Sequence, residues 1–258
     1  NHTPVNLSVE VIHGRRAGPV LFVSAAIHGD EVIGVEILRR VLRSAPLGSM
    51  AGTLLAVPIV NTFGFLNHSR YLPDRRDLNR SFPGYENGSL AAQLAHCFLT
   101  HVIDRCTLGI DIHTAAVHRY NLPQIRIAAG SPYLSELAMS FGAPIIIESP
   151  LRPGSMRALA ADRETPMLLL EAGEALRFDR FSIGVGVAGG AEAAGARKAE
   201  AALSAQLLSA QGQLRERADE LLAAQQEGRR HAAAASAAAQ EKDLVQQALS
   251  RLQAEVAQ

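Results

Sequence analysis

Residues 20–43 read VLFVSAAIHGDEVIGVEILRRVLR, and this stretch contains the pattern that decides the fold. Its first four residues form a β-branched and aromatic run that predicts a buried strand. A turn at residues 27–30 follows, and the apolar residues of 32–43 then recur with the period of a helix. A strand, a turn and a helix in this order form the repeating unit of an α/β protein.

The same alternation continues to residue 183. We expect further strands at residues 9–12, 54–60, 108–112, 125–128, 145–147 and 167–170, and helices at residues 90–103 and 133–141. The pattern predicts a mostly parallel or mixed sheet flanked by helices. In open sheets of this kind ligands bind beyond the carboxyl ends of the strands, so polar residues just after strands are the candidates for a site.

Composition excludes several classes of protein. The 258 residues are 48% hydrophobic, which is enough for a sizeable core, and the 25 basic and 25 acidic side chains cancel. This balance argues against a nucleic-acid or membrane-surface partner. No stretch approaches the roughly 18 apolar residues of a membrane-spanning helix, and residues 1–6 do not resemble the start of a secretion signal. We therefore expect a cytoplasmic protein.

The composition changes near residue 183. All 12 prolines lie at or before Pro166, and every aromatic residue lies at or before Phe181. We predict a folded domain at 1–183, a linker at 184–190 and an Ala-rich helical tail at 191–258. The spaced leucines of the tail favour a coiled coil through which the chain self-associates; a solvated helix or a partly disordered tail is the alternative.

Three residues have the chemistry of metal ligands. His28 and Glu31 are three residues apart at the expected start of a helix, so their side chains project to one side. His113 follows an apolar strand whose end is expected at the same edge of the sheet. Two histidines with one glutamate form a standard zinc set that leaves a position for water, and Asp111 is placed to orient the His113 imidazole. The alternatives are acidic residues that only favour the helix N-terminus, and a histidine buried in the core.

A second group of candidates lies in the loop at residues 69–84, which is dense in Arg, Asp and Asn. Guanidinium groups bind carboxylates in a bidentate manner, so Arg70 and Arg80 are placed to clamp an anionic substrate that Asn79 orients. The alternative is a solvated loop in which these charges pair only with one another.

Glu171 follows the apolar strand at 167–170 and is the candidate for proton transfer. A carboxylate at the end of a buried strand is suited to take a proton from water and return it to a leaving amine. Glu174, next to Gly173, is the weaker candidate. The alternative for both is a solvated carboxylate in the turn that follows the strand.

Four motifs together carry a resemblance to a known family. The motifs are HGDE at 28–31, DLNRSF at 77–82, DIH at 111–113 and LEAGE at 170–174. In order and spacing they resemble the succinylglutamate desuccinylase/aspartoacylase family, a branch of the zinc carboxypeptidase-like fold. The resemblance implies one Zn²⁺ per chain, held by His28, Glu31 and His113, with Glu171 as general base and acid. It also implies that Arg70 polarises the scissile carbonyl and that Asn79, Arg80 and Arg157 bind the substrate.

The function implied by this resemblance is that of a zinc-dependent amidohydrolase. Such an enzyme removes the acyl group from a small anionic N-acyl amino acid or a related small amide. Members of the family usually continue into a small β-rich domain, whereas here the Ala-rich segment follows. Two other functions remain open, a carboxypeptidase-type peptidase and a noncatalytic ligand-sensing scaffold assembled through the helical tail. A complete ligand set together with Glu171 argues against the scaffold.

Overall fold

The computed structural model describes residues 5–43 and 50–193, together with residues 242 and 246. The chain divides into two compact units, residues 1–202 and 203–258. The predicted coiled coil and its self-association therefore fall almost wholly outside the described residues. The fold below is that of residues 5–193.

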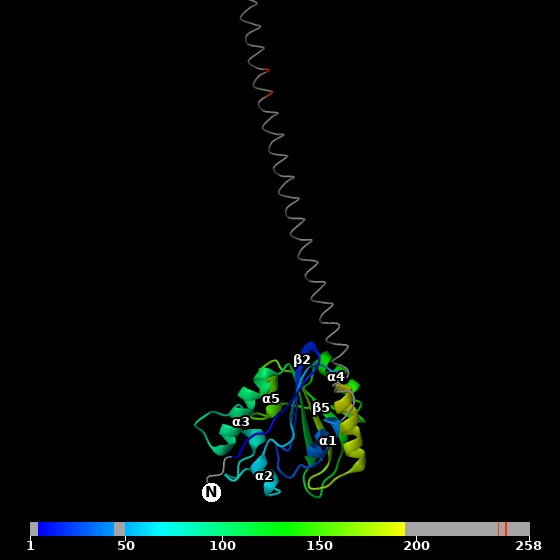
Figure 1. Ribbon diagram of the computed structural model, residues 1–258. Helices are drawn as coiled ribbons and strands as arrows, with labels where there is room; N and C mark the ends of the chain where they lie inside the picture. Colours follow the sequence, from blue (N-terminus) through cyan, green and yellow to red (C-terminus); the bar gives the residue numbers. More distant parts are fainter. Residues whose placement is uncertain (1–4, 44–49, 194–241, 243–245, 247–258) are drawn as a thin grey trace, which may run out of the picture. The chain divides into compact units, whose positions relative to one another are not determined.

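A seven-stranded sheet forms the centre of this described part (Figure 1). Its strands are β1 (Glu10–His13), β2 (Arg16–Ala25), β3 (Ala51–Val57), β4 (Leu108–Ala115), β5 (Asn121–Ile127), β6 (Ile145–Glu148) and β7 (Met167–Glu174). In space they run in the order β1-β3-β2-β4-β7-β5-β6. The pairs β1–β3 and β5–β7 are antiparallel, and the other four described pairs are parallel. The predicted mixed sheet is confirmed.

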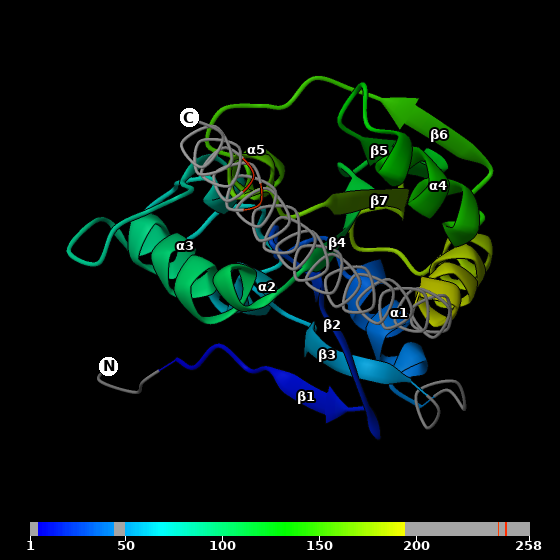
Figure 2. The same cartoon turned by 90° about the horizontal axis from the view of Figure 1, so that it is seen from above.

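Helices cover both faces of the sheet (Figures 1 and 2). They are α1 (Ile33–Val41), α2 (Thr62–Leu66), α3 (Leu90–His101), α4 (Pro132–Phe141), α5 (Met156–Asp162) and a helical segment at residues 180–193. The two views place α1, α4 and the helical segment on one face and α2, α3 and α5 on the other. Short 3₁₀ turns, η2 (Leu78–Arg80) and η3 (Ile103–Arg105), complete the described elements.

Alternation along the strands gives each face its own core. On one face the aliphatic residues of β2, β4 and β7, such as Ile110 and Leu170, pack with Ile37 of α1. On the other face, Phe22 of β2 packs edge to face on Phe98 of α3, with ring centroids 5.9 Å apart. The side chain two positions after Phe22 in β2 points to this second face as well.

Strand register brings polar residues of neighbouring strands together. Ser24 of β2 lies opposite Asp111 of β4, and His113 of β4 lies opposite Glu171 of β7. Residues directly opposite on neighbouring strands share a face of the sheet. A row of polar side chains therefore crosses the carboxyl ends of three parallel strands, where a ligand site is expected.

The predicted linker at residues 184–190 is wrong, because these residues are helical. Their glycines serve close packing: a Cβ at Gly186 would lie 2.3 Å from Ile37, and one at Gly189 would lie 2.3 Å from the Phe141 ring. The sequence shows four glycines in seven residues, which is typical of a linker, but here two of them let a helix lie directly on α1 and α4.

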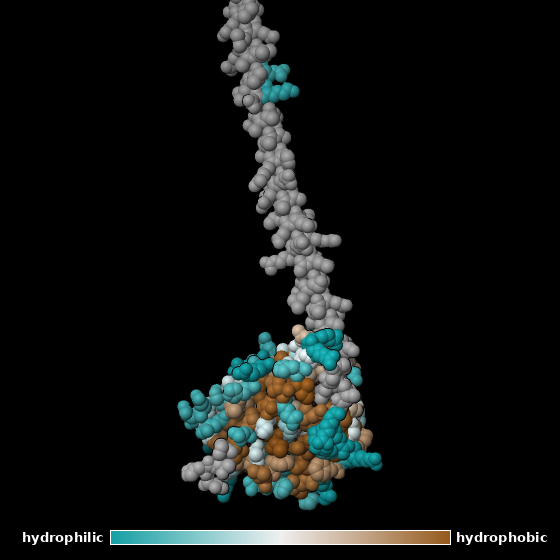
Figure 3. Space-filling view, viewed as in Figure 1, coloured by the Kyte–Doolittle hydropathy of each residue, from teal (hydrophilic) through white to brown (hydrophobic). Residues whose placement is uncertain are grey.

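The surface of the described part is polar over much of its area but carries exposed apolar side chains. In Figure 3 hydrophobic residues gather in the middle of the face seen, with hydrophilic residues at its margins. Val32, Phe65, Leu176 and Phe178 line an open apolar groove of about 500 Å³. Among the described residues, no helix has the length and apolar character needed to cross a membrane.

Candidate active site

The first two ligand candidates lie in the turn between β2 and α1. His28 and Glu31 precede the helix rather than forming its first turn, and the Glu31 N–H donates to the His28 carbonyl at 3.1 Å. Gly29 is required between them, since a Cβ there would lie 1.9 Å from the carbonyl carbon of Gly64 in α2. The N-cap residue of α1 is Val32 and no side chain makes a capping hydrogen bond, so Glu31 does not serve as a cap.

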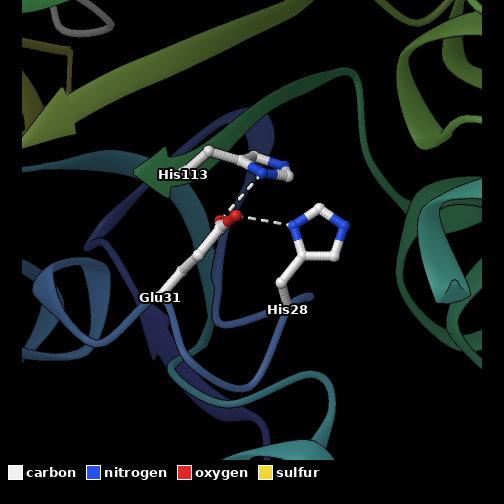
Figure 4. A group of neighbouring side chains, drawn as sticks. All are labelled: His28, Glu31 and His113. Atoms are coloured by element: carbon white, nitrogen blue, oxygen red, sulfur yellow. Dashed lines mark hydrogen bonds and ion pairs between the residues drawn. The ribbon is translucent and has the colours of Figure 1, made fainter. Parts of the chain in front are cut away.

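His28, Glu31 and His113 point toward one another (Figure 4). The two carboxylate oxygens of Glu31 lie 2.7 Å from His28 Nδ1 and 2.9 Å from His113 Nδ1. The imidazole rings are 5.0 Å apart between centroids, and the three side chains are buried. Three possible ligand atoms, one from each residue, lie within 4.8 Å of one another. The predicted ligand set is therefore assembled.

A carboxylate lies behind each imidazole. His28 Nε2 is 3.1 Å from Asp77 Oδ1, and His113 Nε2 is 2.7 Å from Asp111 Oδ2. The other oxygen of Asp111 accepts a hydrogen bond from Ser24 Oγ at 2.8 Å. Such partners fix the orientation of each ring and direct Nδ1 toward a metal. Asp111 has the position that the sequence predicts, whereas the contact of Asp77 with His28 was missed, although it lies within the DLNRSF motif.

Charges within this cluster shift the pKa values of its members. Burial lowers the pKa of His28 and of His113, but the Glu31 carboxylate and the aspartates behind the rings more than offset it, so both pKa values are raised. Burial raises the pKa of Glu31, yet the two imidazoles outweigh it and bring that pKa down to about 2. Without a metal, these shifts favour protonated rings beside an ionised Glu31.

The residues present fit a zinc ion. Two imidazoles and one carboxylate, each directed to one point and buried, are the ligands that catalytic zinc takes in proteins. Both rings have an aspartate on the far nitrogen, so each can lose the proton on Nδ1 and keep its orientation. Zinc would thus compete with protons for the two imidazoles.

Arg70 and Glu171 lie beside this cluster. Arg70 Nη2 donates to Asp77 Oδ2 at 2.9 Å, and its Nη1 lies 3.7 Å from Glu31 Oε1. Glu171 stands next to His113 on the neighbouring strand, and its Oε2 accepts a hydrogen bond from Asn121 Nδ2 at 2.8 Å. The guanidinium and the carboxylate are thus both close to the ligand set.

The three predicted substrate-binding residues make different contacts. Asn79 Oδ1 accepts from the Met156 N–H at 2.8 Å and so ties η2 to the start of α5. Arg80 is exposed and donates to the Asn79 carbonyl. Arg157 is buried and donates to the Ser149 side chain and main chain at 3.0 and 2.7 Å. Of the three, Arg80 is the one most open to solvent.

One cavity of about 520 Å³ joins these residues. All eight residues predicted for the site line it: His28, Glu31, Arg70, Asn79, Arg80, His113, Arg157 and Glu171. Three further arginines line it as well, Arg119, Arg126 and Arg152. Burial, followed by repulsion from Arg126, lowers the pKa of Arg157. Six guanidinium groups around one cavity make a site suited to an anion.

A carboxypeptidase-like sheet with two histidines and a glutamate at the carboxyl ends of its strands is typical of metal-dependent hydrolases. Residues 17–194 match the model of the succinylglutamate desuccinylase/aspartoacylase catalytic domain. The chain belongs to this family, as the four motifs predict.

Individual relatives are distant. N-α-acetyl-L-2,4-diaminobutyric acid deacetylase of Halomonas elongata is 30% identical over 101 residues, which cover 39% of this chain and 30% of that protein. Among solved structures, the product-bound ectoine utilization protein EutE (DoeB) from Ruegeria pomeroyi is 24% identical with a TM-score of 0.68, over 73% of this chain and 60% of that one.

Two further structures support the fold. A succinylglutamate desuccinylase/aspartoacylase from Rhodobacter sphaeroides is 25% identical with a TM-score of 0.68, over 75% of this chain and 60% of that one. A metallo-carboxypeptidase from Burkholderia cenocepacia is 12% identical with a TM-score of 0.57, over 72% and 60%. The chain thus spans 30% of the curated relative and about 60% of these structures.

Proposed function

We propose that this chain is a zinc-dependent hydrolase that removes the acyl group from a small anionic N-acyl amino acid or a related small amide. The observation that carries the proposal is the convergence of His28, Glu31 and His113 at one end of a cavity that Glu171 also lines. Membership of a deacylase family and the distant likeness to a diaminobutyrate deacetylase support the same chemistry.

Each residue of the site has a role in this proposal. His28, Glu31 and His113 hold the zinc ion, which when bound supplies Lewis acidity and makes water reactive near neutral pH. Glu171 accepts a proton from the attacking water on a carboxylate oxygen and returns it to the leaving amine. Arg70 faces the carbonyl oxygen, where charge develops during attack.

Substrate binding falls to the polar end of the cavity. Arg80 is open to solvent and pairs with no carboxylate in the described part of the chain, where its contact is the Asn79 carbonyl, so it can bind the substrate carboxylate. Asn79 holds the same loop through its hydrogen bond with the first residue of α5. Arg157 lines the cavity and holds the segment at Ser149 through hydrogen bonds. Six arginines line the cavity, and a substrate without a negative charge would leave their positive charge uncompensated.

Metal analysis and a substrate screen test the proposal together. Purified protein should carry about one zinc per chain and release free amine from at least one N-acetyl or N-succinyl amino acid. His113→Ala should lose most of the zinc, because two ligands hold the ion poorly. The proposal would be refuted if the purified protein carried no zinc and His28→Ala hydrolysed the substrate as fast as the wild type. Turnover of peptides alone would favour the carboxypeptidase alternative, and binding without turnover would favour the scaffold.

A further inference from the structure

Glu171 is held by two side chains of the neighbouring strand β5, which line the cavity but are assigned neither metal binding nor proton transfer in the function proposed above. Asn121 Nδ2 donates to Glu171 Oε2 at 2.8 Å, and Arg126 Nη1 lies 3.6 Å from Glu171 Oε1. Each carboxylate oxygen therefore has its own partner. No hydrogen bond to Oε1 is found among the described residues, so both lone pairs of this oxygen can accept a proton, whereas Oε2 already uses one.

An irregularity in β5 places Asn121 on the correct face of the sheet. In the antiparallel pairing with β7, Gln124 lies opposite Glu171 and Asn121 lies opposite Gly173. Three residues of β5 therefore span two residues of β7, as in a β-bulge. Without the extra residue, Asn121 would point to the opposite face from Gln124. Pro123 lies inside this irregular stretch, a position that suits a residue without an N–H.

Arg126 is itself held in place by its own strand. It lies two residues after Gln124, so both side chains share the face of Glu171. Arg126 Nε donates to Gln124 Oε1 at 3.3 Å, and Gln124 Nε2 donates to the Leu122 carbonyl at 3.2 Å. This chain of contacts orients the guanidinium toward Glu171 from a fixed base.

We propose that Asn121 and Arg126 are positioning residues that hold the Glu171 carboxylate with Oε2 occupied and Oε1 free to accept the proton. This inference rests on the proposed function, in which Glu171 transfers that proton. Asn121 fixes the rotation of the Glu171 carboxylate through one hydrogen bond to Oε2. Arg126 attracts the negative charge of the carboxylate from 3.6 Å without a hydrogen bond to Oε1. Proton transfer depends steeply on such alignment.

Kinetics on the most active N-acyl amino acid of the screen test the inference. Asn121→Ala and Arg126→Gln should each lower kcat by about 10- to 100-fold with KM and zinc content unchanged, because the affected group is not a substrate ligand. Asn121→Ser and Arg126→Lys, which keep a donor and a charge respectively, should recover part of that loss. A rise in KM at constant kcat would overturn the inference, since both side chains would then bind substrate.

Two matched controls separate this effect from general damage. Asn67→Ala removes an exposed amide that donates to the Phe63 carbonyl at 2.8 Å, and Arg163→Gln removes an exposed arginine 3.8 Å from Asp104. Neither residue lines the cavity, so kcat should not change in these variants. An equal fall of kcat in controls and test variants would also overturn the inference.

Crystal structures of the wild type and of Asn121→Ala provide a readout that needs no activity. The Glu171 carboxylate should turn from its wild-type position in the variant while the backbone of β5 stays in place. A carboxylate that does not move would refute the positioning role. If the wild type hydrolyses none of the amides, the proposed function fails, yet these two structures still decide whether Asn121 holds Glu171.

Discussion

Glu171 and Glu174 lie on the same strand but in different surroundings. Glu171 lines the cavity next to His113. Glu174 instead accepts from the His118 N–H at 2.8 Å and lies 3.2 Å from Arg177, away from the ligand set. The preference for Glu171 drawn from the sequence agrees with this placement, and its role in proton transfer stays a prediction.

Replacement of Glu171 tests that role directly. Glu171→Gln should keep the metal, because Glu171 is not a ligand, but lower kcat by at least about 100-fold, as expected when a general base is lost. Steady-state kinetics and metal analysis of the same preparation measure both effects. Glu174→Gln is the matched control and should retain activity. Similar losses in the two variants would contradict the assignment.

Arg80 should act on binding rather than on chemistry. Arg80→Ala is expected to raise KM for acyl amino acids with a free carboxylate and to leave kcat nearly unchanged, since its proposed partner does not react. The corresponding amino acid amides, which lack that charge, should show little change in KM. A comparison of KM for each acid and its amide measures the effect. Equal effects on acids and amides would contradict the arginine clamp.

At the scale of elements, the sequence predicted what depends on local pattern. The strands and the helices α1, α3 and α4 appear near their predicted bounds because β-branched runs and helical periodicity mark them. The ligand set could be predicted as well, since two of its members are close in sequence and the third lies near the carboxyl end of the neighbouring strand β4. By contrast α2, with five residues, is too short to show a period.

Partners that depend on strand register could not be predicted. Asn121 reaches Glu171 only through the extra residue in β5, and a sequence does not reveal which strand lies beside β7 or in which register. The contact of Asp77 with His28 likewise joins residues 49 positions apart. The linker was predicted wrongly for a related reason, because glycines that allow close helix packing look like glycines that allow flexibility.

The close packing of the helix at 180–193 against Ile37 can be tested by substitution of its glycines. Gly186→Leu should destabilise the fold by about 1–3 kcal/mol, as overpacking of a core does, because its side chain would meet the buried Ile37. Gly184→Leu is the control, since no atom lies within 4 Å of a Cβ there. Thermal unfolding of the two variants measures the difference. Equal melting temperatures would show that residues 184–190 do not pack on the domain.

For the molecule as a whole, the metal-free protein should depend on pH through the ligand cluster. The raised pKa values of His28 and His113 add stability below 6.5, which is lost as the pH rises through those raised values. The lowered pKa of Glu31 adds stability above 4.5, which is lost as the pH falls toward about 2. The cluster therefore contributes most between 4.5 and 6.5.

Thermal unfolding of chelator-treated protein checks this window. The difference in melting temperature between wild type and Glu31→Gln should be largest between pH 4.5 and 6.5 and should shrink at alkaline pH. Added zinc should reverse the alkaline trend, because metal binding improves as the rings lose their protons. A difference that stays constant to pH 9 would show that the ion pairs of Glu31 do not stabilise the metal-free fold.

The part of the chain after residue 202 should not be needed for the candidate site. All residues of the candidate site lie at or before Glu171, the family match ends at residue 194, and the first compact unit ends at Ala202. A chain shortened to residues 1–202 should therefore keep its zinc and its activity. If residues 203–258 mediate self-association, light scattering should show a fall in mass larger than the mass removed. Loss of zinc after this truncation would show instead that the removed segment completes the site.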